Sequence, residues 1–164
     1  MLAVFVLMAM PQDALGQSRW TAAPEVRRGG HQDIMADVRS ASADLTVVNM
    51  WATWCAPCIE EFPNFVRLAR EDADRGLRVV FVSLDMPEDE TLVAEFLKGQ
   101  GWYARAYLKT GKDNEFINAF STSWSGALPA TFVYDASGAL VDQWESGPVS
   151  YEELARRVRD RYVE

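Results

Sequence analysis

The chain has 164 residues, of which 49% are hydrophobic, and its formal net charge is −8. This length suits a single domain with a substantial core and disfavours a second domain. The negative charge disfavours nucleic acid and anionic lipid as partners, because like charges repel before any specific contact forms.

Residues 1–10 form an apolar run that is too short to span a bilayer, and small residues follow as far as Gly16. This pattern is typical of a signal-peptide core with cleavage near Gly16, or of an N-terminal membrane anchor, although no Lys or Arg precedes the run. A buried N-terminal helix of a cytosolic protein is the alternative. We therefore expect residues 1–16 to be a signal peptide or anchor, and residues 17–164 to form the folded domain.

The first part of this domain is predicted to begin with a polar lead-in over residues 17–30, which show no clear periodicity. Apolar residues Ile34, Met35 and Val38 then indicate a short helix. Residues 45–51 are apolar on both sides of the alternation, which is typical of a central strand covered on both faces.

A period of 3.6 residues begins after Cys55 and predicts a long helix, kinked or broken at Pro63 and ended by Gly76. Residues 77–84 then predict a second buried strand. A strand, a helix and a strand in this order predict a right-handed β–α–β unit with parallel strands.

Further helices and strands are predicted in the second half of the chain. Residues 87–98 are expected to form a helix with four inward residues, namely Leu92, Val93, Phe96 and Leu97. A short strand over residues 104–108, a brief helix capped by Asp113, a hairpin of strands 129–134 and 139–144, and a last helix opened by a capping box at Ser150 follow in order. These elements predict an α/β fold in which helices flank both faces of a central mixed β-sheet of roughly four or five strands.

The chain contains two cysteines, Cys55 and Cys58, which Ala56 and Pro57 separate. A disulfide between them closes too short a loop to stabilise the fold much, so redox chemistry explains the pair better. A structural zinc site takes four ligands, and His31, the one histidine, is expected at the surface. We therefore expect no metal and no other cofactor, with a two-coordinate copper site through both thiols as an alternative.

The position of Cys55 between a strand and a helix predicts its reactivity. At the N-terminus of a helix, unpaired N–H groups and the helix dipole stabilise a thiolate, which is the form that attacks disulfides. Cys58, one turn later, can attack the mixed disulfide that Cys55 forms and release the reduced substrate. Pro57 suits the first helical turn because its missing N–H costs no hydrogen bond there.

Residues 51–58, Trp-Ala-Thr-Trp-Cys-Ala-Pro-Cys, are followed by Glu61-Phe62-Pro63, and residues 126–132 read Gly-Ala-Leu-Pro-Ala-Thr-Phe. Together these segments resemble the membrane-tethered or periplasmic thioredoxin-like reductases of the TlpA and ResA type, over a stretch from about Asp33 to Val158. The resemblance implies a thioredoxin-like fold and thiol:disulfide oxidoreductase activity. It also implies that Pro129 is a cis proline that packs against the disulfide, and that Leu128 offers backbone groups to an extended substrate. An ordinary trans proline that starts a strand is the alternative.

Two polar positions, Asn49 and Glu61, predict how protons reach the second cysteine. Asn49 stands where thioredoxins carry a buried aspartate that moves protons for the second cysteine, so that route is missing. Glu61 corresponds to a glutamate of the ResA-type proteins, and the resemblance implies that it handles this proton. The alternative is a first-turn acid that merely suits the helix dipole. Glu60 is expected to face solvent.

Aromatic residues are expected around the reactive pair. Trp51 and Trp54 are predicted to wall the site, and Trp54, Ala56, Pro57 and Leu128 are the predicted substrate-binding residues. Trp124 is assigned to core packing rather than to a substrate groove.

The sequence therefore predicts a dithiol reductase of disulfides in exported proteins, with the haem-attachment cysteines of apocytochrome c as one candidate substrate. Outside the cytosol no glutathione pool keeps thiols reduced, so we expect a membrane thiol electron donor as a second partner. A periplasmic monomer, either soluble or held by an N-terminal membrane tether, is expected. The alternatives are an oxidant that donates its disulfide, a non-catalytic module that holds a client protein or copper, and a peroxidase.

Overall fold

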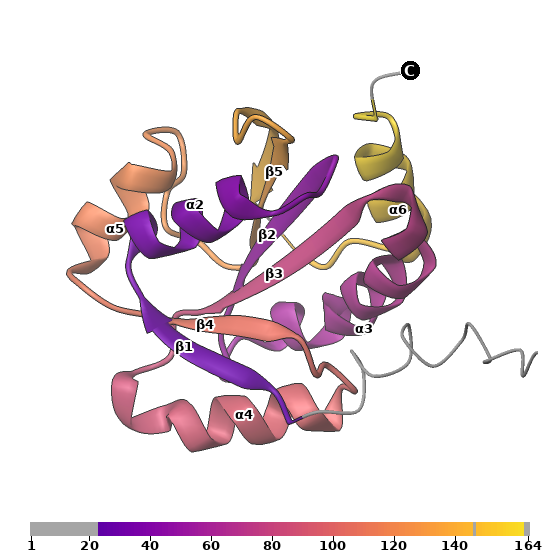
Figure 1. Ribbon diagram of the computed structural model, residues 1–164. Coiled ribbons are helices and arrows are strands. Elements are labelled where there is room, and N and C mark those ends of the chain that lie inside the picture. The colour runs from indigo at the N-terminus through magenta and orange to yellow at the C-terminus, as the bar shows by residue number, and fades with distance from the viewer. Residues whose placement is uncertain (1–22, 146, 163–164) are drawn as a thin grey trace, which may run out of the picture.

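The computed structural model describes residues 23–145 and 147–162 (Figure 1). Within them, six strands form one sheet in the order β1-β4-β3-β2-β5-β6. The first four in that order are parallel to one another, and β5 and β6 add antiparallel strands at one side. Their bounds are Glu25–Gly29 (β1), Leu45–Trp51 (β2), Leu77–Ser83 (β3), Arg105–Lys109 (β4), Ala130–Asp135 (β5) and Leu140–Glu145 (β6).

The sheet is mixed, as predicted, but it has more strands than the sequence indicated. The additional strand is β1, which lies within the segment predicted to be a polar lead-in, and that prediction is wrong for residues 25–29. β1 is an edge strand that pairs with β4, and most of its residues are exposed. With only Val26 packed against the core, such a strand has too few apolar residues to show a period.

Helices cover both faces of the sheet (Figure 1). α2 (His31–Ser40) and α5 (Asp113–Phe120) pack on one face, while α3 (Ala56–Glu71), α4 (Glu90–Gly99) and α6 (Tyr151–Arg159) pack on the other. Successive side chains of a strand point to opposite faces, so Val47 belongs to the hydrophobic cluster on one side and Val48 to the cluster on the other. The predicted α/β class with helices on both faces is confirmed.

The strands β2 and β3 and the helix between them form the predicted parallel β–α–β unit, with pairs from Leu45↔Leu77 to Trp51↔Ser83. The helix α3 runs through Pro63 without a break, so of the two predicted effects of this proline the break does not occur. Pro63 is exposed, so water can bond to the carbonyl group that loses its helical partner. The helix ends at Glu71, and a short 3₁₀ turn over Ala73–Arg75 connects it to Gly76, whose positive φ of 77° suits glycine.

Three details of the later elements differ from the sequence predictions. α4 begins after a 3₁₀ turn over Pro87–Asp89, and Leu92 is 51% exposed, because the buried stripe of this helix runs through Val93 and Leu97. In α5 the N-cap is Lys112, so Asp113 is the first helical residue and not the cap.

The hairpin of β5 and β6 and the start of α6 confirm their predictions. The two strands pair antiparallel. The hydroxyl of Ser150 accepts a hydrogen bond from the backbone N–H of Glu153, which satisfies one of the unpaired donors at the start of α6.

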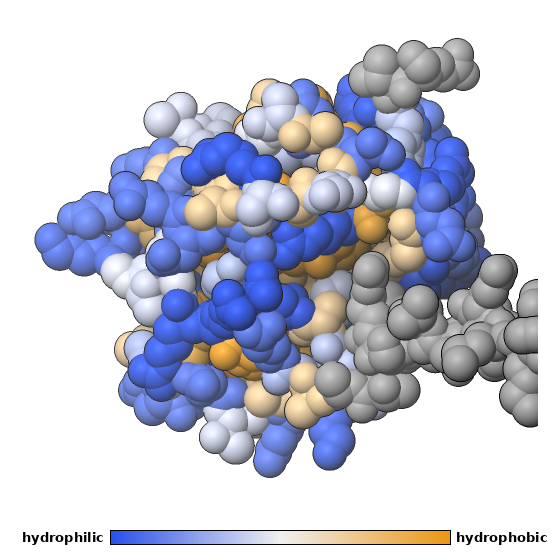
Figure 2. Space-filling view, viewed as in Figure 1, coloured by the Kyte–Doolittle hydropathy of each residue, from blue (hydrophilic) through white to orange (hydrophobic). Residues whose placement is uncertain are grey.

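In the described part of the chain, every helix is too short or too polar to cross a bilayer. The signal peptide or anchor predicted over residues 1–16 lies outside the described residues. The face of the molecule in Figure 2 is largely hydrophilic, and apolar residues show mainly in the gaps between hydrophilic ones.

Candidate redox active site

Cys55 is the N-cap residue of α3, as the sequence predicted. β2 ends at Trp51, and a tight turn carries the chain to Cys55, whose N–H donates to the Ala52 carbonyl at 3.1 Å. The Cys55 carbonyl accepts from the N–H of Ile59 at 3.1 Å, which is the first bond of the helix. The cysteine therefore stands at the positive end of the helix dipole, where the first-turn N–H groups have no helical partners.

The two cysteines form a disulfide, with an Sγ–Sγ distance of 2.04 Å and a Cα–Cα distance of 5.3 Å. Cys55 keeps 6% of its surface exposed, whereas Cys58 keeps 1%. An incoming sulfur therefore has access to Cys55 and not to Cys58. Pro57 lies in the first turn of α3, where the sequence placed it.

The peptide bond between Leu128 and Pro129 is cis, as the resemblance implied. In the antiparallel pairing of β2 with β5, Ala130 is opposite Met50. Pro129, which is buried, therefore lies beside the end of β2, where the chain turns toward Cys55. Leu128 is half-buried and packs against the hydrophobic clusters on both faces of the sheet.

Glu61 is a buried carboxyl on α3 with 2% exposure. Its Oε1 accepts a hydrogen bond from Asn49 Nδ2 at 3.2 Å, and its Oε2 accepts one from the backbone N–H of Val149 at 3.0 Å. The same amide nitrogen of Asn49 donates to Thr131 Oγ1 at 3.2 Å. Burial raises the pKa of Glu61 to about 7, although the hydrogen bonds from Val149 and Asn49 act in the opposite direction.

Glu61 and Cys58 are three residues apart on α3, and both are buried. Residues at this spacing are neighbours on one face of a helix. Glu60 is exposed, as expected. A carboxyl whose pKa is raised to about 7 thus lies one helical turn from the buried cysteine.

Two partners of this carboxyl network were missed by the sequence analysis. Thr131 is a fully buried polar residue in β5, and Val149 contributes only its backbone N–H. A threonine in a run of otherwise apolar strand residues is a weak signal that could have been noticed. A backbone donor from a loop has no signal in the sequence.

The tryptophans divide between surface and core. Trp54 is 68% exposed beside Cys55, in keeping with a wall of the site. Trp51 is fully buried and its ring contacts those of Phe62 and Phe96, so the prediction that it walls the site is wrong. Its side chain belongs to the cluster under α3 because it is the last residue of a strand covered on both faces.

The remaining predicted positions lie as follows. Ala56 is exposed and Pro57 is half-buried, so both border the surface around Cys55. Trp124 is buried, which confirms its assignment to the core, and its indole N–H donates to the Ala127 carbonyl at 2.9 Å. His31 is half-buried, with its ring edge-on to Phe120.

One hollow in the described surface lies away from the disulfide. Residues that precede β2 and β3, such as Ala43 and Gly76, line it together with Trp102. Cys55 follows the other end of β2, so this hollow belongs to the opposite end of the strands. The hollow therefore does not include the cysteine pair.

Comparisons with known proteins identify the family. The sequence model of the AhpC/TSA family matches residues 22–143. The thiol:disulfide interchange protein HelX of Rhodobacter capsulatus is 28% identical over 156 residues, which cover 92% of this chain and 78% of HelX. The thiol-disulfide oxidoreductase ResA of Bacillus subtilis is 31% identical over 94 residues, or 57% of this chain, and the chain spans about half (49%) of ResA.

A solved structure gives the same result. The thiol:disulfide interchange protein of the thioredoxin family from Chlorobium tepidum superposes with a TM-score of 0.63 and 29% identity, over 78% of this chain and 84% of that protein. The names of these relatives describe the chemistry to which a cysteine pair at a helix N-terminus is suited. The chain therefore belongs to the AhpC/TSA family, as one of its thioredoxin-like thiol–disulfide oxidoreductases of the TlpA and ResA type.

Proposed function

We propose that this enzyme reduces disulfides in exported proteins, with Cys55 as the attacking thiol, Cys58 as the resolving thiol and Glu61 as the proton acceptor for Cys58. The observation that supports this most directly is the buried carboxyl one helical turn from a buried cysteine. Cys58 must lose a proton before it can attack, and with 1% exposure it has little access to water that could take it. Glu61, whose pKa is about 7, can accept that proton near neutral pH.

The proposed cycle begins with the reduced enzyme. The Cys55 thiolate attacks one sulfur of the substrate disulfide, that bond breaks, and the departing substrate sulfur takes a proton from solvent. Cys58 then gives its proton to the Glu61 carboxylate and attacks Cys55 in the mixed disulfide. The second substrate sulfur leaves as a thiolate and is protonated, so the substrate has gained two electrons. The enzyme is left with the Cys55–Cys58 disulfide seen in this structure.

We propose a protein as the substrate. Cys55 is partly exposed beside the exposed Trp54, a large apolar side chain that a protein segment could contact. An extended substrate segment would lie across Trp54, Ala56 and Pro57, next to the backbone of Leu128 and the side chain of Pro129. The haem-attachment cysteines of apocytochrome c are one candidate, because they form a disulfide in an exported chain.

We also propose a periplasmic location, with the enzyme as a monomer that is either released or tethered through its N-terminus. The support is the apolar run of residues 1–10 and the small residues after it. In an oxidising compartment the enzyme cannot draw on a cytosolic glutathione pool, so a membrane thiol donor would have to reduce the disulfide after each cycle.

Reduction of insulin by dithiothreitol tests the catalytic roles. The wild-type chain should accelerate the reaction, Cys55→Ser should abolish the acceleration, and Cys58→Ser should accumulate a mixed disulfide, because it can attack but cannot release. Equal rates with wild type and Cys55→Ser would overturn the proposal and favour the binding-module alternative.

The reduction potential of the pair tests the direction of electron flow. We expect a value near that of thioredoxin, about −270 mV, from equilibration with a thiol couple and gel separation of the alkylated forms. A value near about −120 mV, typical of a strong oxidant, would contradict a reductase and make the chain a disulfide donor.

A further inference from the structure

A second buried carboxylate, Asp85, lies two residues after the end of β3 and has 2% exposure. Its Oδ1 and Oδ2 accept from the backbone N–H of Thr53 at 3.2 and 3.0 Å, and Oδ1 also accepts from the Thr53 hydroxyl at 2.5 Å. Oδ2 accepts from the Ser83 hydroxyl at 2.6 Å, and the Asp85 N–H donates to the same hydroxyl oxygen at 3.0 Å. We call Asp85, Thr53 and Ser83 the Asp85 cluster.

A buried carboxylate is costly for a fold unless hydrogen bonds satisfy its oxygens, and bonds to an ionised acceptor are among the strongest in proteins. Three of the four bonds that Asp85 accepts come from Thr53. Thr53 belongs to the turn between β2 and Cys55. The hydrogen bonds of the Asp85 cluster therefore attach the turn that precedes Cys55 to the end of β3.

The register of the sheet shows what the cluster does to this turn. Trp51 is paired with Ser83 at the end of the two parallel strands, and the N–H of Leu84 donates to the Trp51 carbonyl at 2.8 Å. Thr53 and Asp85 have the same sequence offset as Trp51 and Ser83, so their bonds extend the register two residues beyond the strands. Cys55 follows Thr53 by two residues and is the N-cap of α3.

We propose that Asp85 is a positioning residue for thiol–disulfide exchange. By holding Thr53, it keeps Cys55 at the N-cap of α3, where the first-turn N–H groups stabilise the thiolate. The hydrogen bonds of the cluster do not involve either sulfur atom, so reduction of the disulfide, which removes the crosslink between Cys55 and Cys58, does not itself break them. The proposal rests on Cys55 as the attacking thiol, and it holds for either direction of electron flow.

Removal of Asp85 should shift the pKa of the Cys55 thiol in opposite directions, depending on whether Asp85 acts by holding the turn or through its negative charge. The direction of the shift therefore tests the proposal. If Asp85 acted through its negative charge, its removal would favour the Cys55 thiolate and lower the pKa of that thiol. If Asp85 acts by positioning, its removal frees the turn, the thiolate loses its donors, and the pKa of the thiol rises.

The experiment measures alkylation of Cys55 by iodoacetamide as a function of pH, in the full chain with Cys58→Ser so that one thiol reacts. At a temperature at which circular dichroism shows each variant to be folded, Asp85→Ala should raise the midpoint by about one pH unit and slow the reaction at pH 7 about tenfold. Asp85→Asn keeps the shape and an acceptor oxygen for the Thr53 N–H, and should restore most of the rate. The matched control is Glu88→Gln, which removes an exposed carboxylate from the same segment and should match the parent.

Several results would overturn the proposal. An unchanged midpoint in folded Asp85→Ala would leave Asp85 with a structural role only, and a lowered midpoint would show that its charge acts instead. If Asp85→Ala does not fold, Thr53→Val, which lacks the hydroxyl that bonds Asp85, should still raise the midpoint, and an unchanged value would refute the proposal. An unreactive Cys55 in the parent protein would instead contradict its assignment as the attacking thiol.

Discussion

Glu61 shows how one amide decides the properties of a buried acid. Its carboxyl is bonded by Asn49, which is neutral, and by a backbone N–H. An aspartate at position 49 would place two carboxyls at hydrogen-bonding distance, and one of them would then stay protonated because like charges this close cannot both ionise. With an amide there, Glu61 has no second carboxyl as its partner at position 49, and burial raises its pKa to about 7.

The raised pKa of Glu61 predicts how stability changes with pH. Its pKa is raised in the folded chain from the ordinary value of 4.5 to about 7, so the folded state binds more protons than the unfolded state between these values. This contribution to stability is fully present below pH 4.5 and is lost as pH rises through 7, with a magnitude of about 3 kcal/mol.

Urea denaturation of the oxidised protein between about pH 5 and pH 8 measures this effect. The free energy of unfolding of wild type should fall relative to that of Glu61→Gln as the pH rises, because glutamine cannot ionise. Glu60→Gln, which changes an exposed neighbour, should follow wild type. Parallel pH profiles for wild type and Glu61→Gln would show that Glu61 does not titrate in this range.

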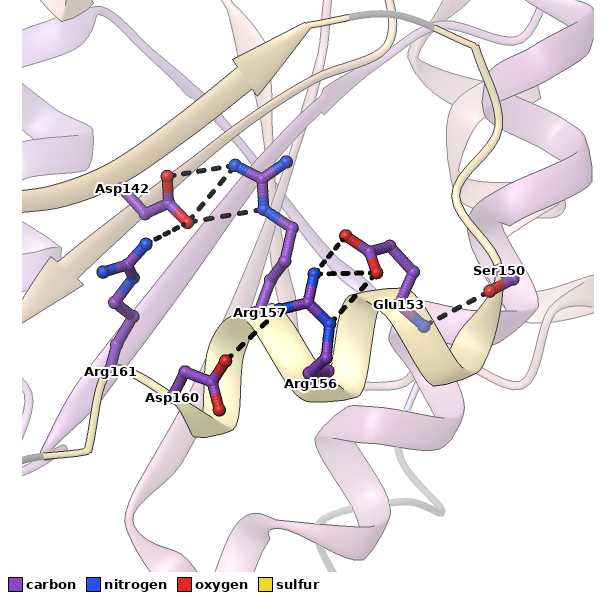
Figure 3. A network of polar contacts seen from close by, with 7 residues as sticks. All are labelled: Asp142, Ser150, Glu153, Arg156, Arg157, Asp160 and Arg161. Atoms are coloured by element: carbon purple, nitrogen blue, oxygen red, sulfur yellow. Dashed lines mark hydrogen bonds and ion pairs between the residues drawn. The ribbon is translucent and has the colours of Figure 1, made fainter.

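At the scale of elements, α6 is attached to the rest of the fold by arginines with different surroundings. Arg159 donates two bonds to Asp72, at 2.7 and 2.9 Å, and the Asp72 side chain is 2% exposed. Figure 3 shows Arg157 and Arg161 reaching Asp142 of β6, whereas Arg156 pairs with Glu153 and Asp160 along the helix itself. Arg157, Arg159 and Arg161 therefore connect the region of α6 to other parts of the fold, whereas Arg156 does not.

We expect Arg159→Ala to reduce the free energy of unfolding by about 2 kcal/mol, because it leaves the carboxylate of Asp72 buried without its charged partner. Arg156→Ala should change the free energy of unfolding far less than Arg159→Ala does, because both members of its pair with Glu153 are well exposed. Chemical denaturation of the two variants measures the difference. Equal losses would mean that burial of the Asp72 carboxylate does not matter.

At the scale of the whole molecule, the fold depends on the two hydrophobic clusters that flank the sheet. The disulfide joins residues three apart in sequence at one end of α3. A crosslink across such a short loop restricts the unfolded chain only slightly, and the entropy model gives it about 2 kcal/mol or less.

A Cys55→Ala/Cys58→Ala variant should therefore fold cooperatively, with a free energy of unfolding within about 2 kcal/mol of the oxidised wild type. Denaturation of the variant, with wild type reduced by dithiothreitol as the comparison, measures this. Loss of cooperative unfolding in the variant would show that the disulfide is a structural element and not only a redox group.

The sequence alone determined the β–α–β unit, the hairpin and the position of Cys55 at a helix N-terminus. Each of these depends on a pattern within one short stretch of chain, such as the change of hydrophobic period after Cys55. The motif around Cys58 and the segment around Pro129 were sufficient to predict the family. The short edge strand β1 was missed because its pairing with β4, and not its own pattern, makes it a strand.

Only the tertiary structure decided the chemical surroundings of the two buried acids. Glu61 bonds Asn49 and Val149, which are 12 and 88 residues away in sequence, and Asp85 bonds Thr53 across 32 residues. Periodicity reports which face of an element is buried, but it does not report which polar groups meet there. These contacts arise from strand register and helix packing. They surround Glu61, whose pKa is raised to about 7, and they join Asp85 to the turn before Cys55.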